Sequence, residues 1–181
     1  MRQAKKEIKE HGILEGLLCT IAVGRLGTIG SDGSPVIKPL NFAYDQGKIY
    51  FHSAREGEKI EDIKRDPRVC FEVDLPIALV KSTGNPCRAA YLYRSVIAMG
   101  RARIIDDEAE RIFGLRLLMK KYQPEGGYEP YPGDKLGITS VIRIDIERMT
   151  GKEDLGEGDI RDAVLSGLAK NAALPLVFTR K

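Results

Sequence analysis

Hydrophobic and polar positions along the chain first predict three short strands joined by tight turns. A first strand is predicted over Val23–Ile29, and the turn residues Ser31–Pro35 return the chain as a second strand over Val36–Ala43. The next turn, Asp45–Gly47, leads to a third strand over Lys48–Phe51. Connections this short join antiparallel strands, because parallel pairing needs a long crossover. We therefore expect an antiparallel meander.

A short helix is predicted directly after the third strand. Ile60 and Ile63 lie three residues apart and so share one side of a helix. The helix ends at Asp66, because the residue before Pro67 is pushed out of the α region. Another strand, Val69–Val73, follows at once. The start of this helix should therefore lie at one end of the predicted sheet.

The rest of the chain adds helices, strands and two glycine- and proline-containing segments. Apolar residues at helical spacing predict an opening helix within Lys5–Leu18, a helix over Asp107–Tyr122 capped by Asp106 or Asp107, and a terminal helix over about 159–173. Strands are predicted over Ser95–Ile105 and, from strict alternation, over Ile138–Met149. These elements predict a single domain, residues 1–181, that is mainly β with added helices and a C-terminal helical extension at about 159–173.

Two segments lack periodicity and are interpreted as long loops. Leu75–Tyr93 contains two prolines, and Gln123–Lys135 is rich in proline and glycine. Loops of this length in a compact domain are usually functional or disordered. Tyr122, Tyr128 and Tyr131 lie in or beside the second loop, where they either form a lid over a flat ring or pack on the outside of the sheet.

Composition excludes several classes of protein. The formal charge is only +3, basic residues are dispersed among acidic ones and Trp is absent, so we expect no nucleic-acid surface. No apolar run reaches the roughly 18 residues of a membrane helix, and the charged N-terminus, Met1–Glu10, lacks the apolar core of a secretory signal. We expect a cytoplasmic protein. Three widely spaced cysteines and two distant histidines predict neither a disulfide framework nor a metal site.

Candidate chemistry gathers where the third strand meets the short helix. Backbone N–H groups at a helix start lack intrahelical partners and favour a bound anion, as does the helix dipole. His52 and Ser53 precede the helix, and Lys59 in its first turns adds a cation, so the site suits a phosphate. The alternative is that a polar residue here only caps the helix.

Two stretches of the sequence carry a resemblance to a known family. The pattern from Gly24 to Asp74, together with Tyr93–Arg103 and the helix after it, resembles the FMN-binding split-barrel family that includes pyridoxamine 5'-phosphate oxidase, and within it the NimA-type 5-nitroimidazole resistance proteins. The likeness covers roughly residues 5–150. It implies a six-stranded antiparallel split β-barrel that binds FMN as a homodimer, with the flavin in clefts between two barrels.

The resemblance also assigns roles to individual residues. Those matching the phosphate-binding positions are His52, Ser53, Ala54 and Lys59, whereas Glu58 stands where pyridoxamine 5'-phosphate oxidases carry a further basic residue. Residues matching the remaining flavin-contacting positions are Lys38, in place of an arginine, Arg94, from either subunit, and the backbone of Pro39, Leu40, Asn41 and Phe42 along the ring. Taken alone, Pro39 fits equally an edge strand without a ligand.

Three functional hypotheses follow. The first is an FMN-dependent oxidoreductase of the NimA type that reduces small nitro compounds or similar acceptors, with His52 as a proton donor and catalytic residue. The second is a flavin- or haem-binding protein without turnover. The third, a true pyridoxamine 5'-phosphate oxidase, is disfavoured because the likeness does not reach that enzyme's C-terminal substrate segment. No Gly-x-Gly-x-x-Gly follows a strand, so NAD(P)H would act only as a diffusing reductant.

Overall fold

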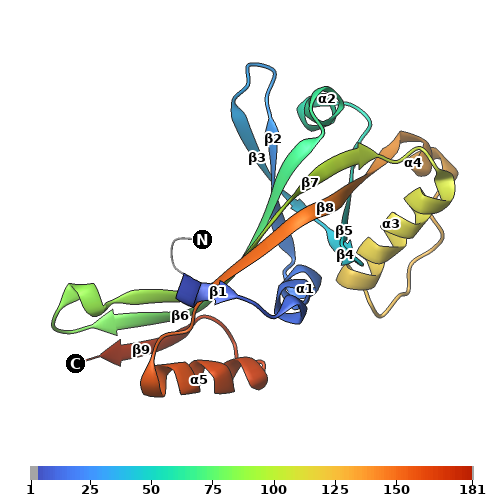
Figure 1. The fold of residues 1–181 in the computed structure, drawn as a ribbon. Helices are drawn as coiled ribbons and strands as arrows, with labels where there is room; N and C mark the ends of the chain where they lie inside the picture. Colours follow the sequence, from blue (N-terminus) through green and yellow to red (C-terminus); the bar gives the residue numbers. More distant parts are fainter. Residues whose placement is uncertain (1–3, 181) are drawn as a thin grey trace.

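A computed structural model describes residues 4–180, which form one nine-stranded sheet flanked by helices (Figure 1). The strands are β1 Glu7–Ile8, β2 Val23–Ile29, β3 Pro35–Asn41, β4 Ala43–Asp45, β5 Lys48–Ala54, β6 Arg68–Ser82, β7 Ala90–Ile104, β8 Thr139–Asp154 and β9 Leu176–Arg180. The helices are α1 His11–Thr20, α2 Glu58–Arg65, α3 Glu108–Tyr122, α4 Gly133–Ile138 and α5 Gly158–Ala169, with 3₁₀ turns η1 Ala4–Lys6 and η2 Pro86–Arg88.

The sheet follows the order β3-β2-β6-β7-β8-β5-β4, with β1 added beside β8 and β9 beside β6. Every pair is antiparallel except β6 and β9. The predicted mainly β fold of the split-barrel type, with added helices, is confirmed. The sheet has nine strands rather than six, because short strands at its margins pair through their backbones and leave no periodic signal in the sequence.

The barrel has its own hydrophobic core, in which three aromatic side chains are fully buried. Phe42, Phe51 and Phe71 come from separate parts of the sheet, and the rings of Phe42 and Phe71 meet edge to face at 4.8 Å. Ile60 and Ile63 of α2 pack into the same core, as their spacing predicts. This packing fixes α2 against the barrel and so places the helix start beside the end of β5.

The predicted loop Leu75–Tyr93 is wrong, because most of it is sheet. β6 and β7 remain paired as far as Val80 and Ala90, with a register shift between Pro76 and Ala78. Pro76 is accommodated at this irregularity, where its missing N–H interrupts the ladder least. The two strands extend well beyond the barrel to form a separate lobe (Figure 1).

A second hydrophobic cluster holds this lobe together. Ile77, Val80 and Leu92 of the long strands pack against Leu155 and, on α5, Val164. The predicted terminal helix exists but ends at Ala169, and the chain then continues into β9, which the sequence analysis missed. The lobe therefore combines the extended strands with α5 and β9.

The start of α1 differs from its predicted position, whereas α3 begins where predicted. α1 begins at His11 rather than near Lys5, since Glu7 and Ile8 pair with β8 instead. α3 begins as predicted, with the Asp107 carboxylate accepting the Glu110 N–H at 2.8 Å. α3 also lies very close to the sheet: a Cβ added to Gly114 would fall 2.8 Å from the Val141 side chain.

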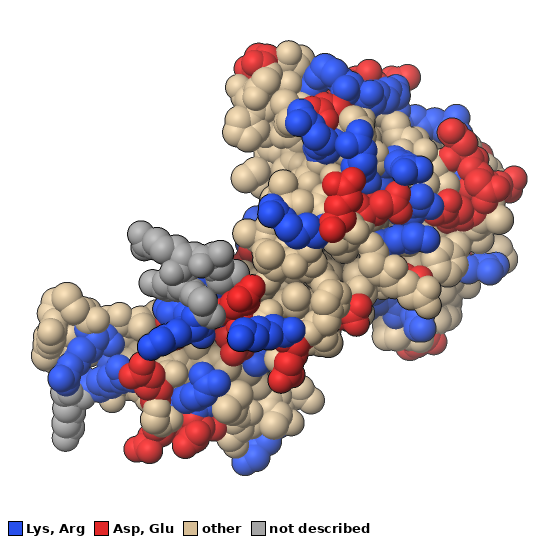
Figure 2. Space-filling model, in the orientation of Figure 1, with Lys and Arg blue, Asp and Glu red and all other residues tan. Residues whose placement is uncertain are grey.

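Charge and hydropathy of the described residues add two observations. Basic and acidic side chains are interspersed over the face drawn in Figure 2, so the described part of that face carries no stripe of one sign. Within residues 4–180, no helix combines the length and the apolar character required to cross a bilayer.

Candidate functional site

The candidate site lies where β5 ends and α2 begins. β5 runs three residues further than predicted and pairs with β8, so that His52 lies opposite Val141. Side chains alternate along a strand. Phe51 therefore points into the barrel core, whereas His52 points to the other side of the sheet and stays accessible to solvent.

Within residues 4–180, no side chain caps the start of α2. Gly57 occupies the N-cap position with φ 120° and ψ 164°, a conformation open almost only to glycine. The partly buried Ser53 is therefore not the cap, which removes the alternative interpretation of this residue. The first N–H groups of α2 remain without a side-chain acceptor, as an anion-binding helix start requires.

Lys59 supplies a cation at this helix start. Its side chain is partly buried, and its Nζ lies 5.4 Å from the centroid of the Phe51 ring. Among residues 4–180 it forms no ion pair with a carboxylate. Burial, together with the positive charge of Lys38, lowers the pKa of Lys59. An anion bound here would relieve both effects.

Lys38 lies nearby but is already neutralised. Its Nζ lies 3.0 Å from the Glu58 carboxylate and 3.4 Å from that of Asp62. Although burial alone raises the pKa of Asp62, hydrogen bonds from Arg65, Thr28 and Lys38 hold it below its ordinary value. Glu58 thus serves as a partner for Lys38.

His52 lines a cavity of about 270 Å³ between the sheet, α3 and α4. The wall is mostly apolar and includes Leu115, Leu118 and Leu136. Tyr131 also lines it, and its buried hydroxyl has no hydrogen-bond partner among the described residues. Partial burial and the positive charge of Lys59 lower the pKa of His52. The imidazole is therefore mainly neutral at pH 7.

The predicted ring-binding strand is only partly available. β3 is an edge strand, with Pro39 and Asn41 exposed and Leu40 packed against the core. Phe42 is fully buried, and its N–H donates to the Tyr122 hydroxyl at 2.9 Å. The backbone N–H of Phe42 is thus already engaged within the chain, whereas Pro39 and Asn41 remain exposed.

The exposed Ala54 lies at the end of β5 with the other phosphate-site candidates, but Arg94 does not. Arg94 pairs with Glu153 on β8, at a Nε–Oε2 distance of 2.9 Å. Val141 and Glu153 are twelve positions apart on β8, which corresponds to roughly 40 Å of strand. Within one chain Arg94 is thus remote from His52, and a role in cofactor binding would require the second subunit.

Asp62 belongs to the candidate site although the sequence does not predict it, and the sequence leaves the role of the three tyrosines open. No local pattern marks Asp62, since its partners Thr28 and Lys38 come from β2 and β3. Of the three tyrosines, Tyr122 ties α3 to the backbone of Phe42, Tyr131 lines the cavity beside His52, and Tyr128 is exposed. The packing interpretation holds for Tyr122, and a lid over a flat ring stays a prediction.

Comparison with known proteins identifies the family to which this site belongs. A sequence profile described as pyridoxamine 5'-phosphate oxidase matches residues 11–153. The chain belongs to the pyridoxamine 5'-phosphate oxidase family. The matched region contains β2 to β7 and the whole of the candidate phosphate site. A search among curated proteins gives no match.

Several solved structures of other proteins are similar to this chain. A candidate 5-nitroimidazole antibiotic resistance protein from Bacteroides thetaiotaomicron is 25% identical, with 81% of this chain and 86% of that chain covered and a TM-score of 0.72. An F420 reductase is 25% identical, with 78% and 98% covered and a TM-score of 0.52. The flavocytochrome Anf3 from Azotobacter vinelandii shares the fold. It is 20% identical, the match covers 90% of this chain and 77% of that chain, and the TM-score is 0.76.

Proposed function

We propose that this chain is an FMN-binding flavoprotein that reduces small nitro compounds or similar acceptors. The observation that carries the proposal is Lys59, a partly buried cation at the start of α2; in the described part of the chain it has no carboxylate partner and no side chain caps the helix. A phosphate monoester satisfies both groups at once, through charge-assisted hydrogen bonds and the helix dipole. Similarity to a nitroimidazole resistance protein and to an F420 reductase supports a redox role.

Each residue of the site has a defined task in this proposal. Lys59 and the N–H groups of α2 hold the phosphate, while Ser53 and Ala54 border it at the end of β5. The exposed edge of β3 at Pro39–Asn41 leaves room for a flat ring beside the strand. Lys38 contributes mainly by holding Glu58 and Asp62 in place.

The acceptor would bind in the cavity that His52 and Tyr131 line. Bound flavin would supply the electrons, received from a diffusing reductant such as NAD(P)H. His52 would deliver a proton to the acceptor as it is reduced, and the unpaired Tyr131 hydroxyl would orient it through a hydrogen bond. The largely apolar wall favours small organic molecules over charged ones.

Titration with FMN and riboflavin tests the phosphate assignment directly. The two ligands share the ring and differ in the phosphate, so FMN should bind more tightly by roughly 1.5 to 3 kcal/mol, the range for hydrogen bonds to charged groups. Quenching of flavin fluorescence measures both dissociation constants. Equal affinities would remove the assignment of the α2 start as a phosphate site.

We further propose that the protein is a two-fold homodimer that covers the flavin ring. β7 lies in the middle of the sheet, yet Ile97 is 44% and Met99 39% exposed on one of its faces. Arg148 and Thr150, opposite them on β8, are also exposed. An apolar centre with a polar rim on a central strand is typical of an interface between subunits.

Replacing Ile97 by aspartate should dissociate this dimer. Light scattering should give twice the 20.1 kDa chain mass for the wild type and the single-chain mass for Ile97→Asp, because the carboxylate would be buried unpaired at the interface. Leu165→Asp is the matched control, since Leu165 is similarly exposed, at 40%, on α5. A dimer that tolerates Ile97→Asp would show that this face is not the interface.

A further inference from the structure

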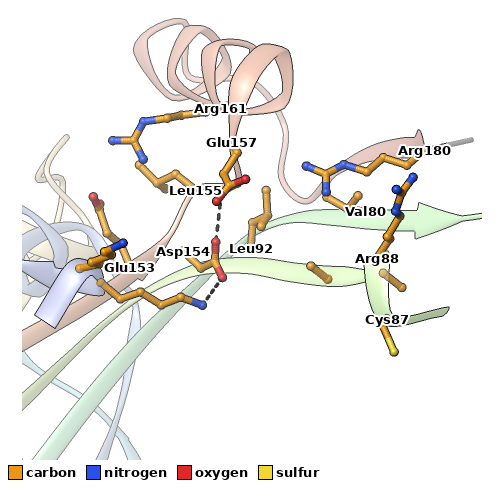
Figure 3. Close-up of a pocket in the computed structure, with 15 residues that line it drawn as sticks. Val80, Cys87, Arg88, Leu92, Glu153, Asp154, Leu155, Glu157, Arg161 and Arg180 are labelled. Atoms are coloured by element: carbon orange, nitrogen blue, oxygen red, sulfur yellow. Dashed lines mark hydrogen bonds and ion pairs between the residues drawn. The ribbon is translucent and has the colours of Figure 1, made fainter. Parts of the chain in front are cut away.

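A second cavity, of about 530 Å³, lies in the lobe formed by the ends of β6, β7 and β8 with α5 and β9 (Figure 3). Part of its wall, including Leu155, Arg161 and Arg180, lies beyond the residues matched by the family profile. Glu153, which also lines it, is roughly 40 Å along β8 from the partner of His52. Within one chain this cavity is thus separate from the proposed flavin site.

The charges that line the cavity are unequally satisfied. Two of its acidic residues already have partners. The Asp154 carboxylate accepts hydrogen bonds from the Lys6 ammonium at 2.5 Å and from the Gly156 N–H at 3.1 Å, and the Glu153 carboxylate accepts one from Arg94. Three arginines also line it, namely Arg88, Arg161 and Arg180. Within residues 4–180 their side chains make no hydrogen bond or ion pair. Among the described residues that line the cavity, the free positive charge therefore exceeds the one remaining carboxylate, that of Glu157.

The arginines project from backbone that is held in place. The Arg88 N–H donates to the Asn85 carbonyl at 3.0 Å, and the Arg180 carbonyl accepts the Thr83 N–H at 3.1 Å. Figure 3 shows the Arg88 and Arg180 side chains at one end of the cavity and Arg161, from α5, at the other. Guanidinium groups are thus presented at both ends by fixed elements.

The surface between these arginines is apolar. Val80 and Leu92 lie in the β6–β7 ladder and Leu155 follows β8, and each is at most 2% exposed as part of the second hydrophobic cluster. Ala89 and Ala90 add small apolar side chains. A ligand that fits must therefore present an uncharged body to this floor and anionic groups to the arginines.

We propose that this cavity binds a small organic anion, with phosphate or carboxylate groups attached to an uncharged body. Guanidinium groups bind both kinds of oxyanion through paired N–H···O bonds, and the cavity volume lies within the roughly 300–1,000 Å³ range of small-molecule sites. Within one chain this site is distinct from the start of α2, where the flavin phosphate is proposed to bind.

Alkylation of the native protein tests the proposal without any variant. Cys87 lines the cavity and is exposed, whereas Cys19 is exposed on α1, far from it in the sequence and outside the cavity wall. With FMN present, ADP or citrate should slow the reaction of Cys87 with iodoacetamide as ligand concentration rises, and leave Cys19 unaffected. Peptide mass spectrometry separates the two cysteines. If only ADP protects Cys87, the cavity binds organic phosphates. If only citrate protects it, the cavity binds carboxylates.

Substitutions locate the binding. Arg88→Ala and Arg161→Ala should each weaken the protecting ligand roughly tenfold or more, whereas Arg116→Ala, which removes an exposed arginine from α3, should not. Lys59→Ala, which alters the other anion site, should also leave protection of Cys87 intact. Failure of both ADP and citrate to protect Cys87, or protection that survives both cavity substitutions, would overturn the proposal.

Discussion

Replacing Lys59 by alanine is expected to weaken FMN binding by roughly 1.5 to 3 kcal/mol, the range for a hydrogen bond to a charged group, or about 10- to 150-fold in dissociation constant. Among residues 4–180 Lys59 has no carboxylate partner and lies in the first turn of α2, so its loss removes a free positive charge from the proposed phosphate site. Riboflavin binding should change much less, because riboflavin has no phosphate. Fluorescence titration of both ligands against both proteins measures the four constants.

The same helix provides a control for this substitution. Lys64 carries the same charge but is exposed and already paired with Glu61, at 2.9 Å, so Lys64→Ala should leave FMN affinity unchanged. Lys59→Arg should restore part of the loss, since a guanidinium also binds phosphate. Equal weakening by Lys64→Ala would mean that general positive charge, rather than a site at Lys59, attracts the ligand.

The sequence predicts the barrel better than the lobe, for a physical reason. β2 has the predicted bounds because turn residues follow it directly, and α2 packs through Ile60 and Ile63 because their spacing is helical; both signals are local. The strands of the lobe contain Pro76 and polar residues that break this signal. They form because β6 and β7 pair with each other and bury Ile77 and Leu92 against α5, which no local pattern reveals.

The candidate site shows the same limit at the level of single residues. The end of β5 and the start of α2 were placed together correctly, because they are adjacent in the chain. Lys38 donates a hydrogen bond to Asp62, which is 24 positions away in the sequence. The Phe42 N–H donates to the hydroxyl of Tyr122, which is 80 positions away. Such contacts decide which matched residues remain free for a ligand, and only the tertiary structure supplies them.

Replacing His52 by alanine is expected to slow reduction of a nitro compound by roughly 10²- to 10⁴-fold, the usual contribution of a positioned acid or base, and to change FMN affinity far less. The imidazole borders the acceptor cavity, whereas the phosphate site depends on Lys59 and the α2 backbone. Protein loaded with FMN and reduced anaerobically is mixed with a 5-nitroimidazole. Return of the oxidised flavin spectrum and loss of nitro absorbance give the rate.

The pH dependence of that rate tests the proton-donor role separately. Partial burial and the charge of Lys59 lower the pKa of His52 from its ordinary value of 6.5, so the donor form accumulates only below that pH, and the rate should rise as pH falls through this region. Lys59→Ala, saturated with FMN, removes the nearby positive charge and should move the rise to higher pH. A rate that is independent of pH and unchanged in His52→Ala would assign the proton to solvent, and a flavin that stays reduced against nitro compounds and quinones alike would leave a binding protein without turnover.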